Sequence, residues 1–221
     1  MSYFTDICFR GPKEELDKIF RILNVGDWSR TVDVREIIDS INTAFPKQTI
    51  PEEILPVEGC VFDAADLEQR LFPPDFYGKV TLWTESTRDN YINLWKWFAS
   101  LFKDVEFLYM SENEEDGIFV TNDKEGEEFP DLFYVSAYIP KEIQLLIYPD
   151  FSDWNGDEYY TEYFSSTGDL CDALSTFINR EFDTPNAVQR YAEVINGIIV
   201  DIYDEYKVDA YFNIYTYKFE E

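Results

Sequence analysis

The side chains of this sequence that are most able to do chemistry are carboxylates, because Asp and Glu number 45 while histidine is absent. Without an imidazole the chain has no base for a Ser/His/Asp or Cys/His arrangement and no histidine ligand for a metal. Pairs of carboxylates can perform acid–base chemistry, but among so many no pair stands out by its spacing. The sequence also lacks a glycine-rich phosphate loop and a Gly-x-Ser-x-Gly motif. We therefore expect a protein that is not an enzyme and needs no cofactor.

The carboxylates are concentrated in the middle of the chain. Residues 104–172 carry 19 acidic and 2 basic residues, whereas the whole chain of 221 residues has a net charge of −27. Carboxylates arranged in rows resemble the phosphates of DNA, and tyrosines are favoured as anchors in protein interfaces. The sequence therefore predicts binding to a basic protein, such as a nuclease or another nucleic-acid-binding protein, and no direct contact with nucleic acid or membrane. The candidate partner-binding residues are Glu112, Glu114, Glu115, Asp116, Asp123, Glu125, Glu127, Glu128, Asp150, Asp153, Asp157, Glu158, Tyr159, Tyr160 and Glu162.

Two other interpretations compete for the same carboxylates. In the first, they occupy solvated turns and sheet edges, where charge discourages aggregation. In the second, Asp153, Asn155 and Asp157 occupy positions 1, 3 and 5 of a calcium-binding loop. That loop requires glycine at position 6 and glutamate at position 12, but this sequence has Gly156 at position 4 and Phe164 at position 12. We therefore expect no metal site.

The elements that position these residues are predicted from hydrophobic spacing. Apolar stripes with helical period predict five amphipathic helices, at 12–23, 34–45, 91–102, 167–178 and 185–202. Alternating or short apolar runs predict strands at 3–10, 79–85, 105–110, 118–121, 132–139, 142–148 and 209–219. Glu114 to Gly117 predicts the turn of an antiparallel hairpin. The five prolines of residues 46–78 indicate a long connection, with one short helix at 64–71.

This mixture of helices and hairpin-like strands predicts an α+β protein, with a mainly antiparallel sheet and amphipathic helices on one face. The strand–helix–strand–strand order of residues 79–122 is half of a ferredoxin-like fold. We expect one domain over residues 1–221, with the proline-rich connection at 46–78 as the place where it would subdivide.

The compartment follows from what the sequence lacks. Its mean hydropathy is −0.33, and it has no apolar run of the roughly 20 residues that a membrane span requires. The first residues have neither the basic nor the apolar region of a signal peptide. Cys8, Cys60 and Cys171 are widely spaced and follow no zinc pattern, so we expect reduced thiols in a cytoplasmic protein.

Three segments carry a resemblance to a known family. They are the run from Val80 to Ser86 before a helix, the run from Leu101 to Gly117, and the opening from Ile7 to Leu16. Together they resemble the YubB-type ferredoxin-like domain of small plasmid- and phage-borne proteins. The resemblance implies a ferredoxin-like fold in a protein of a mobile element, and it implies no activity.

The sequence thus favours a non-enzymatic, acidic, protein-binding or inhibitory protein. Two versions fit the charge pattern: a DNA mimic that acts as an anti-defence protein, or an immunity protein that blocks a nuclease toxin. The alternative is an accessory ferredoxin-like domain that binds a small ligand in a cleft over the sheet. The sequence leaves the oligomeric state open.

Overall fold

The structure is a computed structural model that describes residues 3–25, 32–54, 61–62, 79–86, 91–147, 158–178 and 180–220. Its helices and strands confirm the α+β class. Among the described residues no helix is both long enough and apolar enough to cross a membrane. The predicted helix at 64–71 and the candidate residues Asp150, Asp153 and Asp157 lie outside the described residues.

The chain divides into two compact units, each with its own core. The first unit comprises Met1–Phe129 and Phe219–Glu221, and the second comprises Pro130–Lys218. The chain therefore passes from the first unit to the second between Phe129 and Pro130, and returns to the first between Lys218 and Phe219. Two separate groups of buried apolar side chains, one in each unit, are the physical reason for this division.

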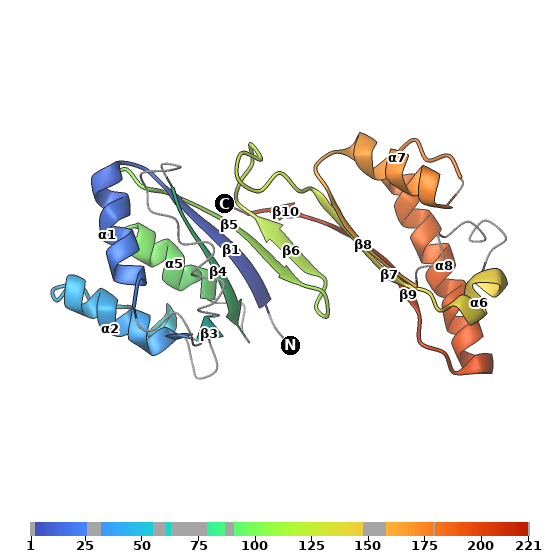
Figure 1. Ribbon diagram of the computed structural model, residues 1–221, viewed down its shortest axis with the longest axis horizontal. Coiled ribbons are helices and arrows are strands. Elements are labelled where there is room, and N and C mark those ends of the chain that lie inside the picture. The colour runs from blue at the N-terminus through green and yellow to red at the C-terminus, as the bar shows by residue number, and fades with distance from the viewer. Residues whose placement is uncertain are drawn as a thin grey trace. The chain divides into compact units, whose positions relative to one another are not determined.

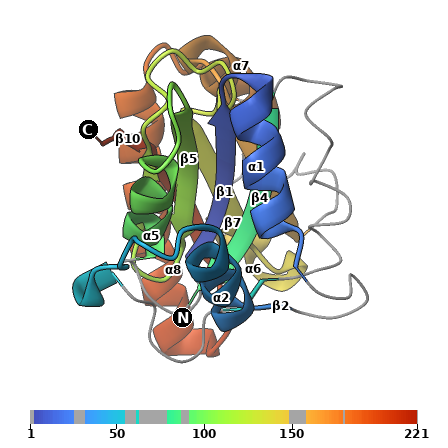
Figure 2. The same ribbon diagram turned by 90° about the vertical axis from the view of Figure 1, so that its left-hand side faces the viewer.

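The first unit is built on one seven-stranded sheet, and its helices lie in the connections between consecutive strands of the chain (Figures 1 and 2). Its elements are β1 (Tyr3–Arg10), α1 (Lys13–Leu23), β2 (Val32–Asp33), α2 (Val34–Ala44), the short 3-10 helix η1 (Glu52–Ile54), β3 (Val61–Phe62), β4 (Lys79–Ser86), α5 (Tyr91–Ala99), β5 (Glu106–Asn113), β6 (Ile118–Thr121) and β10 (Lys218–Phe219). The strand order is β10-β6-β5-β1-β4-β3-β2. Both β4 and β5 pair with β1 in antiparallel register, so they run parallel to each other with β1 between them. Helix α5 makes the connection from one to the other.

Helix α1 illustrates why the sequence folds this way locally. Pro12 precedes its first turn, and Glu14 and Glu15 lie in that turn, where the helix dipole favours negative charge. Leu16, Ile19 and Leu23 form one stripe and are fully buried in the core of the first unit. Burying each of these side chains contributes about 1.5–3 kcal/mol relative to leaving it in water.

The second unit contains a three-stranded antiparallel sheet with the strand order β8-β7-β9. Its elements are β7 (Phe133–Tyr138), α6 (Lys141–Ile147), β8 (Tyr159–Phe164), α7 (Thr167–Ile178), α8 (Pro185–Tyr206) and β9 (Tyr211–Thr216). The three helices lie on the same side of this sheet (Figure 1). Val135 and Ala137 of β7 point toward the helices and pack in the core of the unit.

Two segments differ from the sequence prediction. The predicted strand at 142–148 is wrong, because Lys141–Ile147 form helix α6. Ile143 and Ile147, four residues apart, are both buried on one side of that helix, and Pro140 precedes its first turn. In addition, residues 159–164 form strand β8, which hydrophobic spacing did not indicate because most of its side chains are exposed.

Candidate partner-binding surfaces

The structure distributes the candidate carboxylates over both units. Glu112 to Glu128 belong to the first unit, and Glu158, Tyr159, Tyr160 and Glu162 belong to the second. The described candidate residues therefore form two groups, one in each unit, and the contacts of each group are given separately below.

The hairpin between β5 and β6 carries the first group, which consists of Glu112, Glu114, Glu115 and Asp116. Its turn closes as predicted, with the Gly117 amide donating to the Glu114 carbonyl at 3.3 Å and with Gly117 at φ +63°. The side chain of Asn113 accepts a hydrogen bond from the Asp116 amide at 2.8 Å. The Asp116 carboxylate accepts another from the Tyr3 hydroxyl at 2.9 Å. Glu114, Glu115 and Asp116 are exposed, so this hairpin presents negative charge to solvent.

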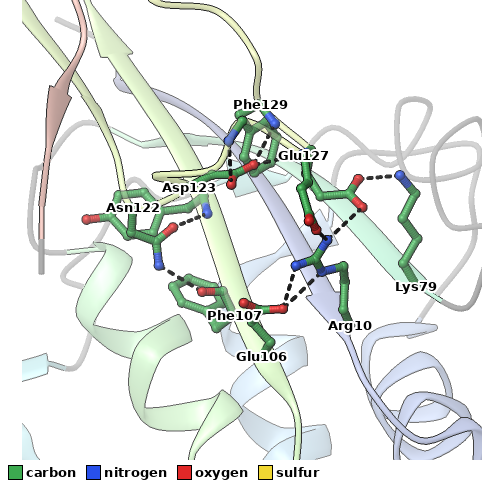
Figure 3. Close-up of polar contacts among 11 residues, drawn as sticks. Arg10, Lys79, Glu106, Phe107, Asn122, Asp123, Glu127 and Phe129 are labelled. Atoms are coloured by element: carbon green, nitrogen blue, oxygen red, sulfur yellow. Dashed lines mark hydrogen bonds and ion pairs between the residues drawn. The ribbon is translucent and has the colours of Figure 1, made fainter.

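Asp123 has a structural role in the loop that follows β6 (Figure 3). Its side chain is 3% exposed and accepts hydrogen bonds from the amides of Gly126, Glu128 and Phe129 at 3.0, 2.7 and 2.9 Å. Burial by itself raises the pKa of this carboxyl, but hydrogen bonds from the loop amides outweigh burial and hold the pKa below its ordinary value. The assignment of Asp123 to an exposed binding surface is therefore corrected: its carboxylate is used to fold the loop.

Glu127 and Glu128 of the same loop are held by cations of the sheet (Figure 3). The guanidinium of Arg10 donates to Glu106 at 2.6 Å and also to Glu127, and the Lys79 ammonium pairs with Glu128. The Glu128 side chain is only 12% exposed. These contacts clamp the loop onto the sheet. Glu128 is shielded from solvent there, whereas Glu127 stays 59% exposed beside Arg10 and Glu125 is exposed.

The loop lies beside Cys8, which is fully buried and free. Burial and the neighbouring carboxylate of Glu128 raise the pKa of this thiol to about 12. Cys8 is therefore protonated at neutral pH and serves as an apolar side chain, not as a nucleophile. Cys171 is likewise free and buried, and burial again raises its pKa.

In the second unit, Tyr159 and Tyr160 point to opposite faces of the sheet, because successive side chains of a strand alternate. Tyr160 packs against the helix-side core, and its hydroxyl donates to Glu162. Burial and that carboxylate raise the pKa of Tyr160. Tyr159 is 65% exposed. Of the two predicted anchors, only Tyr159 therefore lies on the face away from the helices.

That face is lined with tyrosine. The register places three residues from each strand on it, and we define the tyrosine face as Tyr134, Tyr138, Tyr159, Tyr163, Tyr211 and Tyr215, with Ser136, Thr161 and Asn213 between them. The rings form two rows across the strands. Tyr134 lies 4.6 Å from Tyr163 and 5.9 Å from Tyr215, and Tyr138 lies 4.4 Å from Tyr159 and 6.3 Å from Tyr211, measured between ring centroids.

Two carboxylates lie near the end of β7, at the start of helix α6. Helix α6 begins directly after β7, so Glu142 in its first turn comes close to Tyr138. Glu158, directly before β8, accepts a hydrogen bond from the Lys141 amide at 3.3 Å. Partial burial raises the pKa of Tyr138, and Tyr159, Glu158 and Glu142 raise it further. The Tyr138 phenol is therefore neutral under physiological conditions.

A separate cavity of about 220 Å³ lies in the first unit. It is lined by Tyr3, Ile92, Asn93, Lys96, Ser111, Ile118, Val120 and Glu220. Lys96 also lies over the ring of Tyr109, with its Nζ 5.2 Å from the ring centroid, and the Tyr109 hydroxyl donates to Glu220 at 2.7 Å. The cavity is smaller than the roughly 300–1,000 Å³ of typical ligand pockets, but polar groups from several elements converge on it.

Sequence reasoning identified part of the tyrosine face and missed the rest. It singled out Tyr159 as a candidate anchor and predicted a strand at 209–219, which contains Tyr211 and Tyr215. It gave no role to Tyr134 and Tyr138 of β7. The signal was present in the alternation of residues 133–138, but only the pairing with β8 and β9 shows that these rings meet tyrosines from both neighbours.

Within the part of the chain that the structure describes, no group of three or more His, Cys, Asp or Glu side chains is placed to hold a metal ion. Comparisons with protein-family models, with curated proteins and with solved structures found no match to this chain.

Proposed function

We propose that this chain is a non-enzymatic protein that binds a basic protein partner, and that the exposed rings of the tyrosine face are part of the binding surface, while Tyr134 of that face is buried. The observation that carries the proposal is the exposure of Tyr159, Tyr163 and Tyr211, at 65%, 43% and 37%, on one face of a sheet in a chain of net charge −27. Exposed aromatic groups of this kind mark interaction surfaces, where tyrosine supplies a rigid apolar ring and a polar hydroxyl.

The charge of the chain supports a basic partner over an acidic or neutral one. Complementary charge accelerates encounter and makes association sensitive to salt. The exposed carboxylates of the β5–β6 hairpin and the carboxylates at the start of α6 contribute to this field. Because the partner is basic, the best candidates are nucleases and other nucleic-acid-binding proteins, which carry positive grooves for phosphate.

The inhibitory role has two versions. A DNA-mimic anti-defence protein needs many carboxylates that occupy a phosphate-binding groove, whereas an immunity protein needs only a surface that fits one nuclease toxin. Asp123 is buried by its loop and Glu128 is shielded beside Lys79, which reduces the carboxylates available for mimicry. The tyrosine face favours the immunity version, because rings provide shape-specific contacts that phosphate mimicry does not need.

A salt-dependent capture experiment tests the proposal. The tagged full chain is used to capture proteins from a lysate of its natural host, and each captured protein is then purified and titrated against the chain by calorimetry at low and high salt. We expect a basic partner whose affinity falls as salt rises, and whose nuclease or DNA-binding activity the chain inhibits. Partners that are acidic, or whose affinity is independent of salt, contradict the proposal.

The finer fold assignment is also a proposal. Within the first unit, strands β5, β1, β4 and β3 are adjacent in that order, and helical connections follow β1 and β4. This pattern supports a ferredoxin-like arrangement with helices on one face, and residues 79–122 form part of it. The remaining strands of the sheet, β10, β6 and β2, extend this arrangement at its edges. The resemblance to the YubB-type domain, the mobile-element setting and the cytoplasmic location belong to the same proposal.

The cavity of the first unit supports a second candidate function, the binding of a small polar ligand. Lys96, Asn93 and Ser111 provide donors there, and Glu220 provides an acceptor. Thermal-shift measurements with a panel of amino acids, nucleotides and sugars, on the wild-type chain and on Lys96→Met, test this candidate. A ligand that raises Tm only in the wild type supports it. A panel without any shift removes it.

A further inference from the structure

The cavity of the first unit is lined by helix α5 on one side and by the sheet on the other. Ser111 and Val120, which are paired on β5 and β6, line it from the sheet. Ile92, Asn93 and Lys96 line it from the helix. Its volume of about 220 Å³ equals that of roughly seven water molecules in the liquid. The cavity therefore suits one small molecule.

Lys96 brings a positive charge to this cavity. Its Nζ lies over the ring of Tyr109, 5.2 Å from the ring centroid, and within the described part of the chain it forms no ion pair. Carboxylates outnumber cations in this chain by 45 to 18, so the lack of an ion pair at Lys96 leaves its ammonium group available to a ligand. An ammonium group binds a carboxylate through charge-assisted hydrogen bonds.

Glu220 brings a negative charge to the same cavity. Its Oε2 accepts a hydrogen bond from the Tyr109 hydroxyl at 2.7 Å, and its other carboxylate oxygen can accept from a ligand. Glu220 and Lys96 form no ion pair with each other, so their charged atoms are more than 4.0 Å apart. Tyr109 is fully buried and contacts both groups, Lys96 through its ring and Glu220 through its hydroxyl. The cavity thus presents a cation and an anion at two separate points.

Asn113 supplies an independent observation beside this cavity. It lies two residues beyond Ser111 on β5 and pairs with Ile118, and both of these neighbours line the cavity. Asn113 is 1% exposed, and its Oδ1 accepts a hydrogen bond from the Asp116 amide at 2.8 Å. Its Nδ2 has no hydrogen-bond partner among the described residues. Since buried polar groups are nearly always paired, this donor favours an acceptor atom at this wall of the cavity.

We propose that the cavity binds a free α-amino acid with a small aliphatic side chain, its carboxylate at Lys96 and its ammonium at Glu220. The side chain of the ligand packs against the apolar groups of Ile92, Ile118 and Val120. The inference rests on the second candidate function, the binding of a small ligand, and names the ligand class. A zwitterion has no net charge, so the net charge of −27 does not repel it, whereas it does repel an organic anion or a phosphate.

The test is isothermal titration calorimetry of the full-length chain with L-valine at millimolar concentration. Two analogues each remove one charged group from valine: isobutylamine lacks the carboxylate and isovalerate lacks the ammonium. Lys96→Met removes the cation of the cavity, and Glu220→Gln removes its anion but keeps an acceptor for the Tyr109 hydroxyl. The matched controls are Lys124→Met and Glu125→Gln, at exposed positions of the loop after β6. Circular dichroism confirms that every variant is folded.

We expect valine to bind, isovalerate to bind more weakly, and isobutylamine not to bind. Lys96→Met is expected to weaken valine binding about tenfold to a hundredfold, because charge-assisted hydrogen bonds are lost. Glu220→Gln is expected to weaken it about twofold to fivefold, because this carboxylate is exposed. The two control variants bind valine as the wild type does. The analogue series uses only the wild-type chain, so it decides the inference even if Lys96→Met does not fold.

Equal affinities for valine and isobutylamine overturn the inference, because the carboxylate of the ligand then contributes nothing. Equal affinities of Lys96→Met and Lys124→Met for valine, or no binding of valine to the wild type, also overturn it. Its failure is distinguishable from that of the candidate function on which it rests. If a nucleotide or a sugar raises Tm in the wild type but not in Lys96→Met, while no aliphatic amino acid does, the ligand class is wrong and the candidate function stands. If no compound raises Tm, the candidate function fails as well, and the binding of a basic partner is still decided by the capture experiment.

Discussion

The side chain of Asn196 in α8 exchanges two hydrogen bonds with the backbone of Phe212 in β9. Its amide Nδ2 donates to the Phe212 carbonyl at 2.7 Å, and its Oδ1 accepts from the Phe212 amide at 2.9 Å. Since β9 is one of the two edge strands of the three-stranded sheet, Asn196 satisfies backbone groups that an edge strand otherwise leaves open to pairing with another chain. The contact also fixes β9, which presents Tyr211 and Asn213 on the tyrosine face.

We predict that Asn196→Ala destabilises the second unit by about 1–3 kcal/mol, because two backbone groups lose their partner. Urea unfolding followed by circular dichroism measures this change. Glu193→Ala, at an exposed position of the same helix, serves as the control and is expected to change stability little. An unaltered unfolding midpoint in Asn196→Ala contradicts the prediction, because it shows that water replaces the two hydrogen bonds to Phe212 without a loss of stability.

A second prediction concerns Asp123 and acid. Because loop amides hold the pKa of Asp123 below its ordinary value, its carboxylate stabilises the folded state above the unfolded pKa, and this stabilisation is lost as pH falls through the folded pKa. Asp123→Asn is expected to cost about 1–3 kcal/mol at neutral pH, because the amide accepts fewer of the loop hydrogen bonds. The difference from the wild type is expected to narrow on acidification below the ordinary Asp pKa of about 4.

The matched control for this prediction is Glu125→Gln, which removes an exposed carboxylate of the same loop. Chemical denaturation of both variants across acidic and neutral pH provides the comparison. If Asp123→Asn and Glu125→Gln unfold alike, the loop amides do not depend on the Asp123 carboxylate.

The third prediction concerns the reactivity of Cys8. Since burial and Glu128 raise the pKa of this thiol from 9.0 to about 12, we expect it to resist maleimide at pH 9 in the folded chain and to react after unfolding in urea. The sign of the linkage follows: the folded state keeps a proton that the unfolded state releases, so this group lowers stability as pH rises from about 9 to 12. Peptide mapping by mass spectrometry locates the label.

Lys79→Ala and Arg10→Ala extend this test, because each removes a cation that clamps the loop beside Cys8. We expect faster labelling of Cys8 in these variants than in Lys18→Ala, whose ammonium forms an ion pair with Glu15 within α1. Rapid labelling of Cys8 in the folded wild-type chain contradicts the packing of the loop on the sheet.

The fourth prediction uses Gly197, which is exposed inside helix α8. A Cβ built at this position meets no atom within 4 Å, and its φ is not in the left-handed region. Gly197→Ala is therefore expected to stabilise the chain by about 0.5–1 kcal/mol, because alanine has the better helix propensity and a less flexible unfolded state. A rise in Tm by calorimetry verifies the gain. A fall in Tm indicates that another surface approaches α8 at this residue.

The local elements followed from short-range physics. The stripe of Leu16, Ile19 and Leu23 predicted α1, and a stripe of the same period predicted a helix at 185–202, which is α8 in the structure. The Thr184 hydroxyl caps α8 by accepting a hydrogen bond from the Ala187 amide at 3.2 Å. The turn from Glu114 to Gly117 was also predicted from the sequence. These features depend on residues within a few positions of one another, so the order of residues suffices to specify them.

Helix α6 and the loop at Asp123 are two places where prediction from the sequence failed. The run from Glu142 to Tyr148 has apolar residues at spacings that suit a strand or a helix, and only the packing of Ile143 and Ile147 in the second core decides between the two. From the sequence, Asp123 was interpreted as a surface carboxylate of an acidic segment. In the structure, amides of its own loop donate to it, and the cations Arg10 and Lys79, which long-range strand pairing brings together, hold Glu127 and Glu128 of the same loop.

The sequence by itself determined the α+β class, the main amphipathic helices and the strong negative charge that favours a basic partner. The tertiary structure alone divided the chain at Phe129 and assembled the tyrosine face from three strands, with β9 more than 70 residues beyond β7. The physical reason is that net charge and hydrophobic periodicity depend only on the identity and order of residues along the chain. A surface depends instead on strand register, and a shift of one residue turns every tyrosine to the other face.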